Sequence, residues 1–133
     1  MNYYKNIISK KIEKSKKPLL LVGSTGITDK DIHNIKMFSS RNNIPIVTTS
    51  RSRGINSRKY KGFKNYGHIG TLGKYTANYA LVQCDLIIII GLVSGEETKQ
   101  SFFVSSKTTA GVLPGIINTE DKTVISISVD KRF

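Results

Sequence analysis

Residues 67–91 read Gly-His-Ile-Gly-Thr-Leu-Gly-Lys-Tyr-Thr-Ala-Asn-Tyr-Ala-Leu-Val-Gln-Cys-Asp-Leu-Ile-Ile-Ile-Ile-Gly, and this stretch decides the fold. A turn with a glycine at every third position leads into a helix-like segment, residues 74–83. Asp85 then opens the apolar run 86–90, which Gly91 closes. An unbroken Leu/Ile run of this length indicates a strand buried on both faces, as in parallel sheets covered by helices. The order of turn, helix and buried strand predicts an α/β sandwich whose ligands bind where the strands end.

The rest of the chain alternates helix and strand patterns. Thr28, with Asp31 three residues later, predicts the N-cap of a helix whose inward face is Ile32, Ile35 and Phe38. Helices and strands alternating at this spacing imply right-handed crossovers and a mostly parallel sheet. We therefore expect a three-layer α/β sandwich, a doubly wound, Rossmann-like sheet of about five or six strands. The further expected elements are a helix at 3–16, a strand at 19–23, a helix at 29–42, a strand at 44–49 and a last strand at 122–130.

Bulk composition predicts a single domain, residues 1–133, large enough to bury a core without disulfides. Cys84 is the only cysteine, and no apolar run approaches the roughly 20 residues of a membrane span, so we expect a soluble, cytoplasmic protein with no membrane contact. The net charge of +12 is uneven, because residues 1–67 hold 15 basic and 3 acidic side chains. This half is a candidate surface for a polyanion, although lysines that only solvate helix faces explain it too.

A basic segment at 50–66 has no usable periodicity and contains no acidic residue. We interpret it as a long surface loop. Tyr60, Phe63 and Tyr66 lie among its cations, a composition seen in single-stranded nucleic-acid surfaces. A domain-interface or ligand-gating loop is the alternative, and we favour it over nucleic acid.

Several landmarks together resemble the central domain of thiamine-diphosphate-dependent enzymes of the acetolactate synthase type. The resemblance covers roughly residues 5–130. The matching pieces are Lys-Pro-Leu-Leu-Leu-Val-Gly at 17–23, Asn-Ile-Pro-Ile-Val-Thr-Thr at 43–49, Arg-Gly at 53–54, Gly-x-x-Gly-x-x-Gly at 67–73, Ala-Asn-Tyr-Ala at 77–80, Cys-Asp-Leu-Ile-Ile-Ile-Ile-Gly at 84–91 and Val-Ile-Ser-Ile-Ser-Val-Asp at 124–130.

The resemblance implies a six-stranded parallel sheet flanked by helices, similar to the nucleotide-binding domain of deoxyhypusine synthase. In the acetolactate synthase branch such a domain holds FAD in a largely structural role. It also implies that thiamine diphosphate sits between two other domains, one with an activating glutamate and one with a Gly-Asp-Gly…Asn metal motif. This sequence contains neither domain and no Gly-Asp-Gly. We therefore expect thiamine diphosphate and Mg²⁺ only together with partner domains.

Two departures from the family pattern fall on the expected flavin crevice. The histidine of the family's Gly-Met-His-Gly loop is Leu72 here. The family's Arg-Phe-Asp-Asp segment corresponds to Val93-Ser94-Gly95-Glu96. ADP, NAD, CoA or no ligand at all thus stand beside FAD as alternatives.

The candidate binding residues lie in the two glycine turns and at the carboxyl ends of the strands. Backbone N–H groups of the turns and the start of the helix at 74 offer donors to a phosphate, and Asp130 offers an acceptor for a ribose hydroxyl. Glycines that a tight turn simply requires, a solvent-facing His68 and a surface Asp130 are the alternatives. No catalytic or metal-ligating set is predicted. The candidates are Gly23, Ser24, Thr25, Gly26, Thr48, Thr49, Gly67, His68, Gly70, Thr71, Leu72, Gly73, Gly91 and Asp130.

Three functions follow from the sequence. The first is a non-catalytic central domain or subunit of an acetolactate-synthase-like enzyme, with a structural and nucleotide-binding role, acting as a homo-oligomer or with partner catalytic domains. The second is a non-catalytic subunit of another complex, such as an epsilon-type subunit of CO dehydrogenase/acetyl-CoA synthase. The third is a polyanion or nucleic-acid binder.

Overall fold

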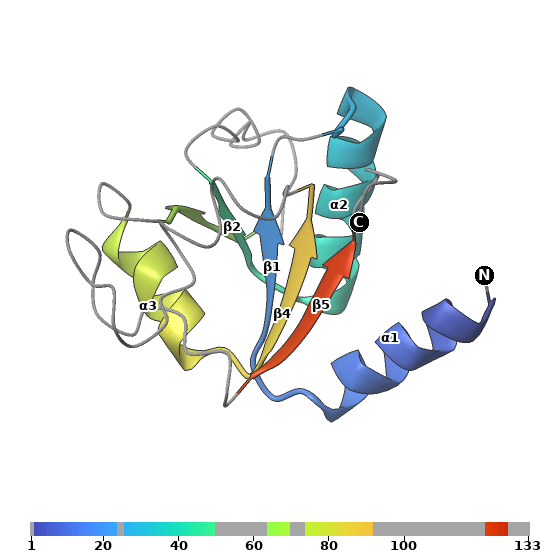
Figure 1. Cartoon of the computed structure of the whole chain (residues 1–133). Coiled ribbons are helices and arrows are strands. Elements are labelled where there is room, and N and C mark those ends of the chain that lie inside the picture. The colour runs from blue at the N-terminus through green and yellow to red at the C-terminus, as the bar shows by residue number, and fades with distance from the viewer. Residues whose placement is uncertain (1, 24–25, 50–63, 70–73, 92–121, 128–133) are drawn as a thin grey trace.

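The computed structural model describes residues 2–23, 26–49, 64–69, 74–91 and 122–127 (Figure 1). These residues form three helices and five strands. None of the described helices is long and apolar enough to cross a membrane. The elements are α1 (Asn2–Lys14), β1 (Pro18–Val22), α2 (Asp29–Asn42), β2 (Ile46–Thr48), β3 (Asn65–His68), α3 (Tyr75–Gln83), β4 (Leu86–Ile90) and β5 (Thr123–Ile127).

The strands form one parallel sheet in the order β3-β2-β1-β4-β5. From β1 the chain winds outward through β2 to β3 and then crosses back to β4 on the other side of β1. The sheet is therefore doubly wound, with its switch point between β1 and β4. This confirms the predicted α/β class, and it confirms that the run Leu86–Ile90 is an interior strand, as its composition indicated.

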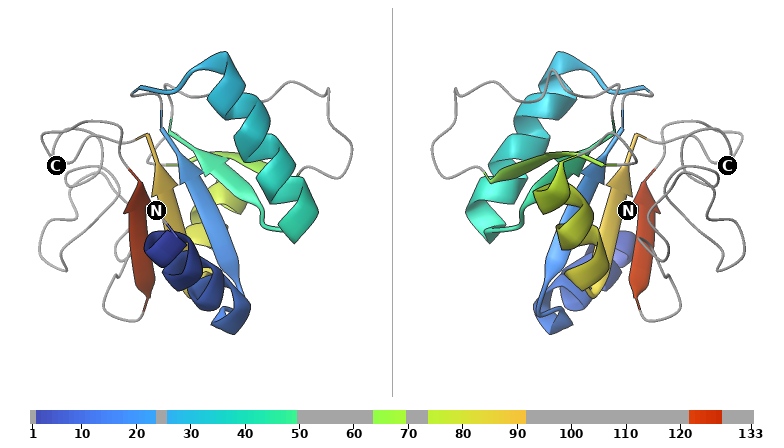
Figure 2. Two further views of the ribbon diagram at one scale, coloured as in Figure 1. Left: turned by 90° about the vertical axis from the view of Figure 1, so that its right-hand side faces the viewer. Right: turned by 90° about the vertical axis from the view of Figure 1, so that its left-hand side faces the viewer.

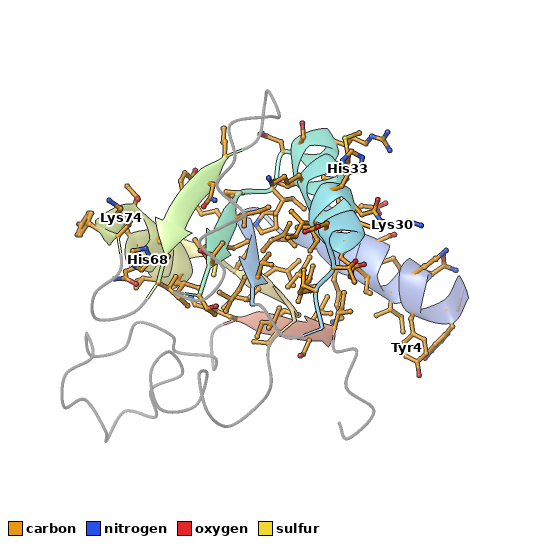
Figure 3. The ribbon with its side chains drawn as sticks, turned by 90° about the horizontal axis from the view of Figure 1, so that it is seen from above. Tyr4, Lys30, His33, His68 and Lys74 are labelled. Carbon is orange, nitrogen blue, oxygen red and sulfur yellow. The ribbon has the colours of Figure 1, made fainter. Side chains whose placement is uncertain are left out.

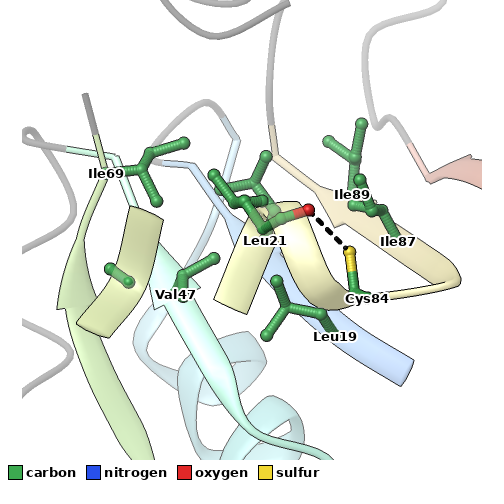
Figure 4. Close-up of a cluster of buried hydrophobic side chains, with 9 residues drawn as sticks. Leu19, Leu21, Val47, Ile69, Cys84, Ile87 and Ile89 are labelled. Atoms are coloured by element: carbon green, nitrogen blue, oxygen red, sulfur yellow. Dashed lines mark hydrogen bonds between the residues drawn. The ribbon is translucent and has the colours of Figure 1, made fainter. Parts of the chain in front are cut away.

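Helices cover both faces of the sheet, giving three layers (Figure 2). Helices α1 and α2 lie on one face and α3 on the other. Alternate residues of each strand point to opposite faces, so the side chains of the Leu and Ile runs belong to two separate core clusters. The α1/α2 face buries Leu20, Val22, Ile35, Ile44, Ile46, Leu86 and Ile88. The α3 face buries Leu19, Leu21, Val47, Ile69, Ala77, Leu81, Cys84, Ile87 and Ile89 (Figure 4).

Helix α2 has the predicted bounds and the predicted cap. The Thr28 hydroxyl accepts from the Asp31 N–H at 3.2 Å, and the Asp31 carboxylate accepts from the Thr28 N–H at 2.9 Å. The prediction that Phe38 faces inward was wrong, since this side chain is 37% exposed. Ser39, four residues after buried Ile35, takes the inward position, because its hydroxyl donates to the Ile44 carbonyl and ties the helix end to the strand that follows.

Strand β3 was not predicted, because Asn-Tyr-Gly-His has none of the β-branched residues that strands favour. Gly67 and His68 lie in this strand and not in a turn. Ile46 pairs with Asn65 and Thr48 with His68, so β3 carries one extra residue in a bulge. The remainder of the expected basic loop, residues 50–63, lies outside the described residues.

Gly67 is the residue that the bulge requires. Its φ is +100°, a backbone conformation that side chains with a Cβ rarely adopt. A Cβ at this position would also lie 2.6 Å from Cγ of Lys74. The start of α3 therefore packs against the bulge, and both facts explain glycine here without a ligand.

At the amino ends of the strands, Asp85 joins the α1–β1 connection to β4. Its carboxylate accepts from the Ser15 hydroxyl and from the N–H groups of Lys16 (2.8 Å) and Lys17 (3.1 Å). Its own N–H donates to the Lys17 carbonyl at 3.2 Å. Partial burial acts to raise the pKa of Asp85, but these donors outweigh burial and hold its pKa below the ordinary value.

Lys122, from a segment distant in sequence, caps the carboxyl end of α3. Lys122 Nζ donates to the carbonyls of Val82 (2.9 Å) and Cys84 (2.8 Å), which lie at the carboxyl end of the helix. No basic residue of α3 itself lies in its last turn. Lys122 therefore supplies the positive charge that a helix carboxyl terminus favours.

Replacing Asp85 tests how much its hydrogen bonds to the α1–β1 connection stabilise the fold. We expect Asp85→Asn to lower the free energy of unfolding by about 1–2 kcal/mol at pH 7, because bonds to a charged acceptor are lost. Since the folded pKa is depressed, the stabilisation is present above the unfolded value of about 3.9 and is lost as pH falls through the folded pKa. Urea unfolding between pH 7 and pH 2 measures it.

The matched control is Glu13→Gln, an exposed carboxylate on α1, which should leave stability within about 0.5 kcal/mol. A gap between wild type and Asp85→Asn that stays constant down to pH 2 would contradict the assignment.

The Gly67 bulge gives a second prediction. Gly67→Ala should cost at least about 1–3 kcal/mol, since alanine is strained at this φ and its Cβ meets Lys74. In a Lys74→Ala background the contact with Cγ is gone, so the cost should fall but not vanish. Denaturant unfolding of wild type, Gly67→Ala, Lys74→Ala and the double variant measures both costs. If Gly67→Ala leaves the free energy of unfolding unchanged in both backgrounds, the bulge does not form.

Candidate functional site at the carboxyl edge

One continuous row of backbone hydrogen bonds runs across the carboxyl ends of all five described strands. Parallel strands end at the same edge of a sheet, which is where open α/β sheets bind ligands. The row lies here because β1, β2, β3 and β4 are each followed by one more residue whose N–H donates to a neighbouring strand. Its bonds run from the Gly91 N–H to the Ile127 carbonyl (3.3 Å), from Gly23 to Ile90 (2.8 Å), from Thr49 to Val22 (3.1 Å) and from Ile69 to Thr48 (2.9 Å).

This edge gathers part of the predicted site. Gly23 and Gly91 follow neighbouring strands at the switch point, and Thr48 and Thr49 end the next strand. His68, half-buried, ends β3 beside them. The candidates Ser24, Thr25, Gly70, Thr71, Leu72, Gly73 and Asp130 lie outside the described residues.

Thr48 holds an unsatisfied hydroxyl at this edge. Its side chain is 0% exposed, and its Oγ1 is the one buried side-chain oxygen or nitrogen within the described residues that has no hydrogen-bond partner. A buried hydroxyl without a partner costs about 1–3 kcal/mol. Because the hydroxyl is fully buried, a ligand group pairs with it only if the side chains that cover it move aside.

The two helices that begin at this edge differ in charge. Helix α2 has Asp29 and Asp31 in its first turn, and its cap is closed by the Thr28–Asp31 pair. The backbone N–H and then the hydroxyl of Thr28 lower the pKa of Asp31, so the carboxylate stays charged near neutral pH. Because these charges already satisfy the positive helix end, the start of α2 disfavours a phosphate.

Helix α3 begins without such a cap. Lys74 is its N-cap, makes no side-chain capping bond, and no acidic residue lies in the first turn. The Lys74 N–H donates to the His68 carbonyl at 2.8 Å, which holds the helix start against the end of β3. Figure 3 shows His68 and Lys74 on the same side of the molecule. A positive helix end and a lysine thus lie at the edge where Thr48 is unsatisfied.

Sequence reasoning overlooked Lys74 and the unfavourable charge of α2. Both signals were present, since Asp29 and Asp31 follow the first glycine turn and Lys74 follows the second. The unpaired hydroxyl of Thr48 had no signal in the sequence, because a threonine at the end of a strand ordinarily finds a partner.

The described residues offer no sign of a catalytic or metal centre. No group of three or more His, Cys, Asp or Glu side chains among them is arranged to hold a metal ion. Cys84 is buried and donates from Sγ to the Leu81 carbonyl at 3.2 Å, so it packs as a small apolar side chain with a weak hydrogen bond (Figure 4).

Comparison with known proteins agrees with this architecture. The acetolactate synthase large subunit of Parasynechococcus marenigrum (strain WH8102) is 31% identical over 80 residues, 60% of this chain and 13% of that protein. A protein named 3D-(3,5/4)-trihydroxycyclohexane-1,2-dione hydrolase, from Lacticaseibacillus casei, is 34% identical over 104 residues, 78% of this chain and 15% of its own length. The protein of that name from Listeria monocytogenes serovar 1/2a is 32% identical over 107 residues, 80% of this chain and 16% of that protein.

The chain therefore spans 13 to 16% of the length of these three relatives. The family model described as thiamine pyrophosphate enzyme, central domain, matches residues 6–132, which is almost the whole sequence and every described strand. This chain belongs to the thiamine pyrophosphate enzyme central-domain family.

Proposed function

We propose that the chain is a non-catalytic central domain of an acetolactate-synthase-like thiamine diphosphate enzyme, and that its carboxyl edge binds an adenine nucleotide of the FAD or ADP type. The observation that carries the proposal is the unpaired, fully buried hydroxyl of Thr48 beside the uncapped, lysine-bearing start of α3. A nucleotide offers polar groups to the hydroxyl and phosphates to the helix start.

The charges indicate which helix receives the phosphates. Placing them at the start of α2 would bring them next to Asp29 and Asp31, whereas the start of α3 adds Lys74 to a positive helix end. Gly23 and Gly91 at the switch point let the ligand approach the backbone, since neither carries a side chain. The bound nucleotide has a structural role in this proposal, so no reaction step is assigned to it.

Catalysis belongs to the complete enzyme in this proposal. Because the chain covers only a small part of its relatives, we propose that thiamine diphosphate and Mg²⁺ bind to partner domains, and that this domain acts in an oligomer or beside those domains. The buried, unbridged Cys84 supports a cytoplasmic location. A role in a CO dehydrogenase/acetyl-CoA synthase complex stays a prediction.

A thermal-shift and calorimetric titration with ADP, FAD, NAD and CoA tests the binding claim. A ligand at 100 times its dissociation constant should stabilise the native state by about 2.7 kcal/mol. We expect ADP or FAD to do so and to lose affinity in Lys74→Gln. If none of the four raises the melting temperature, the nucleotide part of the proposal is wrong.

Thr48→Val tests the role of the hydroxyl in stability and in ligand affinity separately. Valine has the same shape without the unsatisfied hydroxyl, so the ligand-free variant should be more stable by about 1 kcal/mol. Its affinity for the nucleotide should fall roughly threefold to tenfold, since one hydrogen bond is lost.

The matched control is Thr123→Val, an exposed threonine at the amino end of β5, which should leave stability within about 0.5 kcal/mol and keep its affinity. A Thr48→Val variant that is less stable than wild type, with unchanged affinity, would mean that the hydroxyl has a partner and does not contact the ligand.

A further inference from the structure

A cavity of about 430 Å³ lies at the opposite, amino edge of the sheet, on the α3 side. Its walls come from the segments that precede four strands and from the outer face of α3. This volume is in the range of pockets that hold small molecules. We call it the amino-edge groove, and its charged and aromatic lining is Lys16, Lys17, Lys64, Tyr66, Tyr75 and Tyr79.

The three lysines give the groove its charge. Lys16, Lys17 and Lys64 are all exposed, and no acidic side chain occurs in the described lining. Asp85, which follows the lining residue Cys84 and accepts from the N–H groups of Lys16 and Lys17, sets one negative charge against these three positive ones. The groove therefore presents a positive surface to an anion.

The three tyrosines give it flat apolar surfaces. Tyr75 and Tyr79 are 79% and 54% exposed, and their rings stack with centroids 6.0 Å apart and an interplanar angle of 18°. Helix α3, which carries both, contains no charged residue, although 23% of the chain is charged. Tyr66 is held beside the helix, because its carbonyl accepts from the Thr76 hydroxyl.

Exposed rings beside exposed cations match one ligand chemistry better than others. An acidic peptide would use the lysines but not the stacked rings, and an apolar ligand would leave three ammonium groups unused. A phosphate joined to a planar base uses both, since bases stack on aromatic side chains and lysines pair with phosphates. We propose that the amino-edge groove binds nucleotides, either free or as units of a single-stranded nucleic acid.

The groove differs from the carboxyl-edge site. None of its lining residues is among those that end a strand in the hydrogen-bonded row, although it extends along α3 to Tyr75 and Thr76, directly after Lys74. The inference does not depend on the cofactor proposed above, because Lys64 and Tyr79, which the test replaces, take no part in the carboxyl-edge site.

The test uses the complete chain with four probes: AMP, UMP and fluorescently labelled hexamers of adenylate and uridylate RNA. Calorimetry follows the mononucleotides and fluorescence anisotropy follows the hexamers. Tyr79→Ala should weaken binding by about 5-fold to 100-fold, and Tyr79→Phe should not. Lys64→Gln should reduce the slope of log affinity against log salt for the hexamers by about 0.7.

The controls are matched in residue type and lie on the other side of the sheet. Tyr4→Ala and Lys30→Gln change an exposed tyrosine on α1 and an exposed lysine on α2 (Figure 3). Both should bind like wild type. Circular dichroism checks that the tyrosine variants remain folded.

Two results support the inference and identify the source of the ligand. Mononucleotides that bind as tightly as hexamers point to a free nucleotide, and hexamers that bind much more tightly point to a nucleic-acid strand. Three results overturn it: no binding of any probe at about 1 mM, equal losses in Tyr4→Ala and Tyr79→Ala, or a salt slope that Lys64→Gln leaves unchanged.

Discussion

The parallel pairing of β1 with β4 is the constraint on which the rest of the structure depends. Five residue pairs join the strands, from Pro18 with Leu86 to Val22 with Ile90, although more than sixty residues separate them in sequence. Burying such Leu and Ile side chains contributes about 1.5–3 kcal/mol each, and no other pair of segments in the described chain offers two apolar runs of this length. The pairing puts the switch point of the sheet at Gly23 and Gly91. It also determines which residues lie at the carboxyl and amino edges of the central strands.

Each edge of the sheet has its own chemistry. At the carboxyl edge, backbone groups are satisfied by the row of hydrogen bonds, and the exception is a side chain, Thr48. At the amino edge, Asp85 satisfies the α1–β1 connection and leaves lysine and tyrosine side chains facing a groove. The two edges thus differ in their lining, since the carboxyl edge is polar and backbone-lined and the amino-edge groove is aromatic and cationic.

The sequence predicted the elements whose signals are local. The bounds of Leu86–Ile90 and of helix 29–42 were right, because an apolar run between Asp and Gly and a Thr–Asp capping box are determined by adjacent residues. Strand β3 was missed because its pairing with β2, and not its composition, makes it a strand. Gly23, Thr48, Thr49 and Gly91 could be grouped because parallel strands end together. The amino-edge groove could not be predicted, since four segments distant in sequence build it.

Native-state hydrogen exchange measured by NMR tests the central pairing most directly. If β1 and β4 form the middle of the sheet, the amides of Leu20 and Ile88 exchange only through global unfolding, with the same free energy as denaturant unfolding, while β5 amides exchange sooner. Exchange of the β4 amides at the rate of an edge strand, well below the global free energy, would contradict the sheet order and with it the placement of both sites.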